Sequence, residues 1–248
     1  MQSELLTLTD VSLAYQTVEG ETVAIKDLNL TVHDGEFLAI VGPSGCGKTS
    51  VLSLIMGLLP QSAGTIRCEK PDLRMGYMLQ RDHLLDHRTV ERNVLLGLEV
   101  QHRLTAQSRA KAMQLLDTYG LGEFKAYKPH QLSGGMRQKV ALIRTLALEP
   151  DLLLLDEPFS ALDYQTRLTL SDEVYRIIRR EHKSAILVTH DISEAVSMAD
   201  RVAVFSARPA TLKAEIGIDY PASMSPLERR RQATFHDYFD RIWEELQP

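Results

Sequence analysis

The sequence predicts an α/β fold with a parallel-sheet core, an antiparallel β subdomain and an inserted α-helical subdomain. The core is predicted by short apolar runs, typical of strands buried on both faces, at residues 37–41, 152–155, 185–188 and 202–205. The β subdomain is predicted by imperfect alternation of apolar and polar residues at 5–13 and 23–32, as in antiparallel strands joined by a turn at 19–21. Helices are expected between the core strands.

The inserted subdomain is expected at residues 82–147, where strand-like runs disappear. Helical periodicity takes over there, for example at residues 108–119. A chain of 248 residues can bury a sizeable core. We therefore expect one domain, residues 1–248, in which residues 209–248 form a short C-terminal extension.

The C-terminal extension is predicted to end in an amphipathic helix. Ser225, Pro226 and Glu228 provide an N-cap serine, a proline in the first turn and a capping-box glutamate. Apolar residues follow at spacings of three or four: Phe235, Phe239, Ile242 and Leu246. The arginines at 229–231 are expected on the solvated face of this helix, in preference to a contact with anionic lipid or a partner.

Composition excludes several classes of protein. The net charge of −5 and the pI near 5.9 argue against a nucleic-acid binder. Two cysteines, Cys46 and Cys68, are too few for a disulfide framework and suit a reducing compartment. We expect no signal peptide, and no apolar run approaches the ~18 residues that span a bilayer. If this protein serves a membrane, another chain supplies the pore.

A phosphate-binding loop, G-x-x-x-x-G-K-[ST], follows the apolar run at 37–41. The match comprises Gly42, Pro43, Ser44, Gly45, Cys46, Gly47, Lys48 and Thr49, and we count the next residue, Ser50, with the site. Glycines allow the backbone N–H groups to point inward at phosphate oxygens, and the helix that follows presents its positive end. Lys48 is expected on the β- and γ-phosphates of ATP and the Thr49 hydroxyl on Mg²⁺. A purely structural glycine turn is the disfavoured alternative.

Two carboxylates, Asp156 and Glu157, follow the run of leucines at 152–155. A buried strand delivers such side chains to the edge of a parallel sheet where ligands bind. Asp156 is expected to support Mg²⁺ through its water shell. Glu157 is expected to orient or deprotonate the water that attacks the phosphate.

A second anion site is predicted upstream of these carboxylates. Its residues are Ser133, Gly134 and Gly135, which lead into a helix expected from Met136. Backbone N–H groups at a helix N-terminus attract anions. One chain therefore carries two phosphate-binding devices.

The order of these motifs resembles that of the ABC ATPase family across nearly the whole chain. The order is the phosphate loop, Gln80, Leu-Ser-Gly-Gly at 132–135, Leu-Leu-Leu-Leu-Asp-Glu at 152–157, Ser-Ala-Leu-Asp at 160–163, and His190. The resemblance implies a P-loop NTPase (RecA-like) core and a head-to-tail homodimer. Each ATP would then lie between the phosphate loop of one copy and Ser133, Gly134 and Gly135 of the other.

The resemblance also implies roles for single residues. Tyr15 would stack on adenine, although a core aromatic is the alternative. Gln80 would sense Mg²⁺ and the γ-phosphate, which His190 would also contact, and Asp163 would lie in the loop facing the partner's site. The expected catalytic set is thus Glu157, His190, Gln80 and Lys48, and the expected metal set is Thr49, Gln80 and Asp156.

Within the family, the chain is similar to the nitrate/sulfonate/taurine branch of bacterial importers. The similarity rests on residues 88–94, 132–138 and 156–163, although Met136 stands where many members have glutamine. Asp86-His87 also stands where members of this branch often have Pro-Trp. The resemblance implies integral membrane permease subunits, indirectly a solute-binding protein, and a peripheral place on the cytoplasmic face of the inner membrane.

Three other functions stay open at this point. The first is an ATPase subunit of an ABC exporter or lipoprotein-release system. The second is a soluble ABC ATPase of DNA or ribosome metabolism, disfavoured because the chain has no sustained heptads, no cysteine pairs and one phosphate loop. The third is a phosphate-loop kinase, which has no use for a Leu-Ser-Gly-Gly element. The transported solute cannot be read from the sequence.

Overall fold

The computed structural model describes residues 3–17 and 20–247, so the predicted turn at 19–21 lies partly outside the described residues. An antiparallel sheet of order β2-β1-β4 forms the β subdomain. Its strands are β1 (Glu4–Thr17), β2 (Gly20–His33) and β4 (Ala63–Cys68). Half-buried antiparallel strands explain the alternating sequence of the first two.

The core sheet has strand order β5-β6-β7-β3-β8-β9. The strands are β3 (Phe37–Val41), β5 (Met75–Met78), β6 (Leu152–Asp156), β7 (Ser184–Val188), β8 (Arg201–Phe205) and β9 (Leu212–Gly217). Neighbours pair in parallel except β8 and β9, which are antiparallel. Every residue of β3, β6 and β7 is buried, which explains their almost entirely apolar sequences. The predicted α/β core is confirmed.

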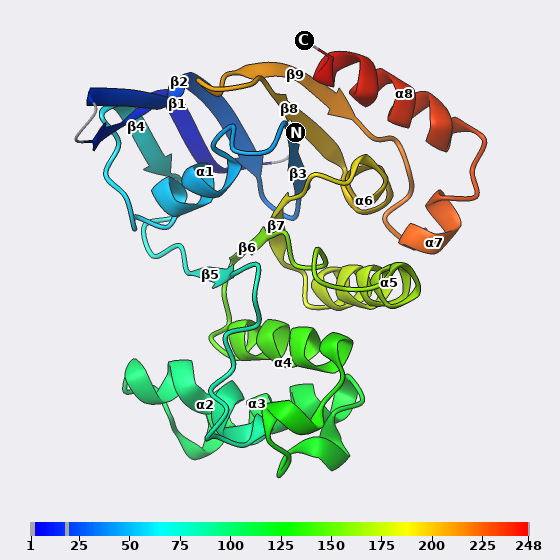
Figure 1. The fold of residues 1–248 in the computed structure, drawn as a ribbon. Coiled ribbons are helices and arrows are strands. Elements are labelled where there is room, and N and C mark those ends of the chain that lie inside the picture. Colours follow the sequence, from blue (N-terminus) through cyan, green and yellow to red (C-terminus); the bar gives the residue numbers. More distant parts are fainter. Residues whose placement is uncertain (1–2, 18–19, 248) are drawn as a thin grey trace.

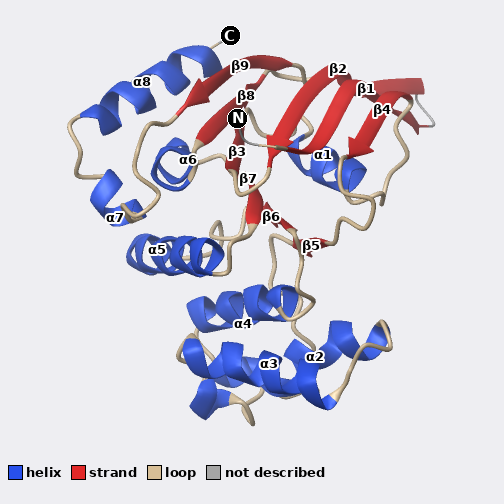
Figure 2. Cartoon of the chain, turned by 180° about the vertical axis from the view of Figure 1, so that it is seen from behind, coloured by secondary structure: helices blue, strands red, loops and turns tan. Residues whose placement is uncertain are grey.

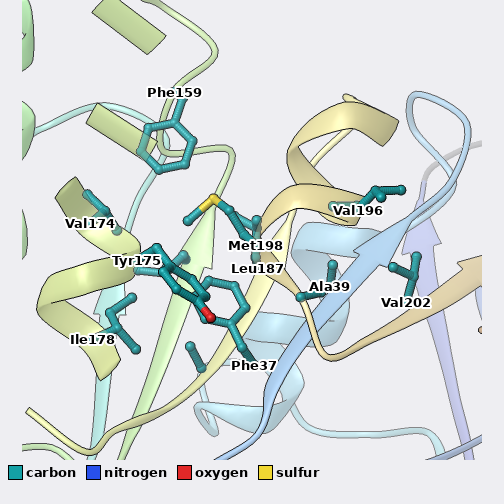
Figure 3. Close-up of a cluster of buried hydrophobic side chains, with 14 of the residues drawn as sticks. Phe37, Ala39, Phe159, Val174, Tyr175, Ile178, Leu187, Val196, Met198 and Val202 are labelled. Carbon is teal, nitrogen blue, oxygen red and sulfur yellow. The ribbon is translucent and has the colours of Figure 1, made fainter. Parts of the chain in front are cut away.

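Both faces of the core sheet are covered (Figures 1 and 2). Side chains of β3 alternate between the two faces. Leu38 and Ile40 pack with α1 (Lys48–Ile55) and the β subdomain. Phe37, Ala39 and Val41 pack with α5 (Tyr164–Arg180), α6 (Ile192–Met198) and the C-terminal extension. Figure 3 shows this second cluster, in which Phe37 lies beside Tyr175 with ring centroids 6.0 Å apart.

A helical layer lies beyond the β5–β6 edge of the core sheet (Figures 1 and 2). It consists of α2 (Val90–Val100), α3 (Ala106–Thr118) and α4 (Gly134–Leu146). These helices enclose their own buried cluster, while α4 also sends Ala141 and Leu142 into the cluster of the core. α4 therefore connects the helical layer to the sheet. Within the described residues, no helix is both long and apolar enough to cross a membrane.

The C-terminal extension differs from its prediction, because two helices take the place of one. Ser225 caps α7 (Pro226–Arg229) through the expected reciprocal bonds with Glu228, but α7 ends after one turn. A second helix, α8 (Thr234–Leu246), then buries Phe235 and Ile242 against the core cluster. The prediction from periodicity treated the two helices as one, because a short break barely changes the spacing of apolar residues.

The predicted solvation of the arginine run is wrong for Arg229. Its side chain is 0% exposed and donates to the carbonyl of Ala199 at 3.0 Å and to the hydroxyl of Tyr175 at 2.6 Å. The guanidinium also lies over the ring of Tyr220, 5.6 Å from its centroid. Hydrogen-bond acceptors and aromatic faces replace water around this charge. A run of arginines in the sequence does not reveal these partners.

Candidate functional site

The phosphate loop connects β3 to α1 and curls around a lysine. Gly45 and Gly47 have φ of 73° and 127°, values that favour glycine. The Lys48 ammonium donates to the carbonyl of Gly42 at 2.8 Å and to that of Pro43 at 3.0 Å. The lysine side chain is therefore held inside the loop, with its charge beside the N-terminus of α1.

The other residues of the loop divide between surface and core. Pro43 and Ser44 are exposed, whereas Cys46 is buried in the cluster shared with the β subdomain. Ser50, in the first turn of α1, lies 3.0 Å from the hydroxyl of Tyr15, and this tyrosine is 36% exposed. Tyr15 is thus not a core residue: its ring lies at the surface beside α1.

Asp156, at the end of β6, lies beside the phosphate loop, at Thr49. One carboxylate oxygen accepts a hydrogen bond from the Thr49 hydroxyl at 3.0 Å, and the other accepts from Tyr77 at 3.3 Å. Burial raises the pKa of Asp156 above its ordinary value, and burial together with the Asp156 charge raises the pKa of Tyr77 to about 12. A divalent cation would supply the missing positive charge. Mg²⁺ suits this pair of oxygen ligands because it completes its shell with substrate phosphates and water.

Glu157, Gln80 and His190 form one cluster beside Asp156. The Glu157 carboxylate accepts from the Gln80 amide at 3.3 Å and lies 3.2 Å from Nδ1 of His190. The Gln80 amide also donates to Ser160 at 3.2 Å. Glu157 has a φ of 43°, in the left-handed region, while its N–H donates to Val188 on the neighbouring strand at 2.9 Å. The side chains of Glu157 and His190 are 22% and 53% exposed, so water and substrate can reach them.

The second predicted anion site lies at the N-terminus of α4. Ser133 caps this helix by accepting from the N–H of Met136 at 3.3 Å. A Cβ on Gly134 would lie 3.2 Å from Leu162 in the loop before α5, and one on Gly135 would lie 3.1 Å from Thr166 in α5, so both positions favour glycine. The helix begins at Gly134, slightly before the expected Met136.

The two anion-binding devices do not meet within one chain. Both views of the fold place α4 well away from α1 (Figures 1 and 2). Among the described residues, no hydrogen bond or ion pair joins residues 133–135 to residues 42–49. A ligand held by the phosphate loop therefore needs a second molecule to reach a helix end of this kind.

Asp163 caps α5 by accepting from the N–H of Thr166 at 3.0 Å, and this bond lowers the pKa of its carboxyl.

Two contacts escaped the sequence analysis. One is the Tyr77 hydroxyl on Asp156, and the other is the Gln138 amide of α4, which donates to the carbonyl of Gln80 at 3.4 Å. The position of Tyr77, three residues before Gln80 on an edge strand, was the available signal for the first.

Comparisons with known proteins agree with this geometry. Residues 25–160 match the family model described as "ABC transporter". An uncharacterized ABC transporter ATP-binding protein of Bacillus subtilis, YtlC, is 44% identical over 95% of this chain and 93% of its own length. The nitrate import ATP-binding protein NrtD of Synechocystis sp. is 38% identical, covering 96% of this chain and 93% of the relative. The aliphatic sulfonates import ATP-binding protein SsuB of Bacillus licheniformis is 40% identical over 81% of this chain and 80% of the relative.

Among solved structures, the chain is similar to the ATP-binding cassette MJ0796, seen as a dimer in a post-hydrolysis state with ADP and Pi. The TM-score is 0.74 at 28% identity, and the match covers 88% of this chain and all of MJ0796. The predicted fold class and the predicted resemblance are both confirmed.

Proposed function

Since this chain belongs to the ABC transporter family, we propose that it is the ATP-hydrolysing subunit of an importer for a small anionic or organic solute of the nitrate, sulfonate and taurine class. ATP hydrolysis coupled to transport is the activity of the family. One observation carries the assignment of the site: Lys48, Asp156 and Glu157 converge on one sheet edge. The importer class rests on the similarity to nitrate and sulfonate import proteins over most of the chain.

We assign the binding of ATP to the phosphate loop and its neighbours. Loop N–H groups and Lys48 hold the β- and γ-phosphates, and the exposed ring of Tyr15 stacks on adenine. Thr49, Asp156 and Gln80 would hold Mg²⁺, which would supply positive charge beside the phosphate oxygens. The raised pKa of Asp156 supports this role, because a cation restores the favourable environment of its ionised form.

Hydrolysis is assigned to Glu157 with His190 and Gln80. Glu157 orients the attacking water and accepts its proton, because this carboxylate lies one residue beyond Asp156 and remains open to solvent. Gln80 and His190 each contact Glu157, so they hold the carboxylate in place and can reach the γ-phosphate. The products are ADP and inorganic phosphate.

A second copy of the chain completes the site. Within one chain, α4 lies well away from α1, and MJ0796 is known as a dimer with bound ADP and Pi. The N-terminus of α4 in one copy would approach the γ-phosphate held by the other, with Asp163 in the adjoining loop. ATP then closes the dimer, and loss of the γ-phosphate opens it. The whole chain, residues 1–248, acts as one nucleotide-binding domain.

The opening and closing of the dimer moves integral membrane permease subunits. Contact with these subunits places the chain peripherally on the cytoplasmic face of the membrane. A solute-binding protein delivers cargo to the same permease. Residues 80–92, which lead from Gln80 into α2, are the proposed contact because they join the nucleotide site to the helical layer.

Co-purification tests the proposal. The tagged chain is recovered from gently solubilised host membranes, and its partners and ATPase rate are measured. A multi-span membrane protein that raises the ATPase rate supports the transporter, and its response to nitrate, sulfonate or taurine with the matching binding protein identifies the solute. Recovery only from the soluble fraction, with ribosomal or DNA-bound partners, would refute transport while leaving the nucleotide site intact.

A further inference from the structure

An arginine outside the assigned site, Arg167 on α5, bridges two loops that carry site residues. One amino group of its guanidinium donates to the carbonyl of Leu162 at 3.2 Å, and the other donates to the carboxylate of Asp191 at 3.3 Å. Leu162 belongs to the loop at 160–163, which ends in Asp163. Asp191 directly follows His190. A single rigid, planar group therefore joins these two loops.

The loop that carries His190 depends on the acid that Arg167 contacts. One oxygen of Asp191 caps α6 by accepting from the N–H groups of Ser193 and Glu194 at 2.8 and 3.2 Å. The Thr189 hydroxyl accepts from the N–H of Asp191 at 3.0 Å and donates to Glu194 at 2.7 Å. His190 is thus held between two residues that both have fixed partners.

Asp191 and Glu194 need positive charge nearby because they repel each other. Glu194 is 3% exposed, and burial raises the pKa of its carboxyl, with the Asp191 charge acting in the same direction. Nε of Arg167 lies 3.8 Å from Glu194, so this guanidinium serves both acids. Removing it would leave two adjacent carboxylates at the base of the His190 loop.

We propose that Arg167 is a positioning residue that couples the 160–163 loop to His190. The part of the proposal that concerns hydrolysis rests on the proposed function of His190 and Asp163. A movement of the 160–163 loop, caused by a second copy of the chain, would thereby shift the imidazole that contacts Glu157.

The first test measures amide hydrogen exchange of the full chain without nucleotide, so it does not depend on hydrolysis. Arg167→Gln should speed exchange at residues 189–194 about tenfold, as expected for the loss of a charged hydrogen bond. Arg176→Gln is the matched control, because Arg176 lies on the same helix, its side chain is 66% exposed, and among the described residues it forms an ion pair with Asp172 and none with Asp191 or Glu194. Equal exchange in the Arg167 and Arg176 variants would overturn the proposal.

The second test separates positioning from simple loss of structure. Arg167→Gln should lower kcat about tenfold while the Kd for ATP stays within about twofold. Asp191→Asn keeps a good N-cap but removes the charge, so adding Arg167→Gln to it should lower kcat by less than about twofold more. Full additivity of the two substitutions would contradict coupling through Asp191. A wild-type chain that fails to hydrolyse ATP, with exchange altered as expected, would refute the proposed function and leave the coupling standing.

Discussion

The sheet edge and the N-terminus of α4 are the two proposed anion-binding regions of this protein, but they are built differently. At the sheet edge, five side chains from four segments converge: Lys48, Asp156, Glu157, Gln80 and His190. At the N-terminus of α4, the proposed donors are backbone N–H groups at two glycines. The hydroxyl of Ser133 already accepts the hydrogen bond that caps this helix.

This difference teaches that the chain holds one reactive half-site and one passive half-site. In the proposed function, the reactive half binds a triphosphate and activates water, and a second copy supplies the donors on the far side of the phosphate. The passive half offers such donors but has no acid or base of its own in residues 133–135. Side-chain changes should therefore be severe in the first region, and in the second they should matter only when they block the approach of phosphate.

The sharpest test of the reactive half is Glu157→Gln. We expect kcat to fall about 100- to 10,000-fold, the usual range for loss of a general base. ATP binding should survive, because Gln keeps the shape and the contact with Gln80. Size-exclusion chromatography with ATP should then show a trapped dimer. Hydrolysis at the wild-type rate would remove Glu157 from its assigned role.

The passive half is tested by Gly135→Asp. A carboxylate in the first turn of α4 favours the helix but opposes a triphosphate brought by the second copy. We expect kcat to fall about 10- to 100-fold while the isolated chain binds ATP normally, and the dimer trapped by Glu157→Gln should not form. Gly135→Ala is the control, since it adds the same Cβ beside Thr166 without charge and should keep most activity. Equal losses in both variants would point to sterics and not to an anion site.

Asp156→Asn tests whether the reactive half is built for a cation. Because the folded pKa of Asp156 is raised, its ionised form costs stability at neutral pH, and that cost disappears as the pH falls through the raised value toward the unfolded one. Without Mg²⁺ and ATP, Asp156→Asn should therefore melt higher than wild type at pH 7. The two melting curves should approach each other as the pH is lowered, and Mg²⁺ with ATP should stabilise the wild type more. A variant that melts lower than wild type at pH 7 would contradict this.

The smallest effect is expected for Met136→Gln. The Met136 N–H serves the cap on Ser133, and the side chain holds no anion in this arrangement. We expect the ATPase rate of the dimer to change by less than about twofold, because glutamine leaves the backbone donors of residues 133–135 unchanged. A larger change in a steady-state assay would show that side chains as well as backbone act at α4.

Motifs fixed in local sequence made the phosphate loop and the Asp156–Glu157 pair predictable. The strand that delivers these acids was equally clear, because its leucines are buried on both faces. Gln80 and His190 came only from family resemblance, since nothing near either residue in sequence reveals Glu157 as its neighbour. Tyr77, Gln138 and Arg167 were missed for the same reason: their partners lie far along the chain.

The C-terminal extension marks the other limit of sequence reasoning. Its N-cap and apolar positions were foreseen, but the break between α7 and α8 and the burial of Arg229 were not. The burial of Arg229 depends on acceptors supplied by Ala199 and Tyr175, whose positions only the folded core defines.

The left-handed backbone of Glu157 has a consequence for how this protein can change over evolutionary time. A non-glycine residue at a φ of 43° costs of order 1–3 kcal/mol, so glycine at this position would relieve strain. A laboratory selection for heat resistance alone should therefore enrich glycine or asparagine at position 157 and silence hydrolysis. Glutamate is expected to persist there only under selection for ATP hydrolysis, because the stability of the fold alone favours glycine or asparagine.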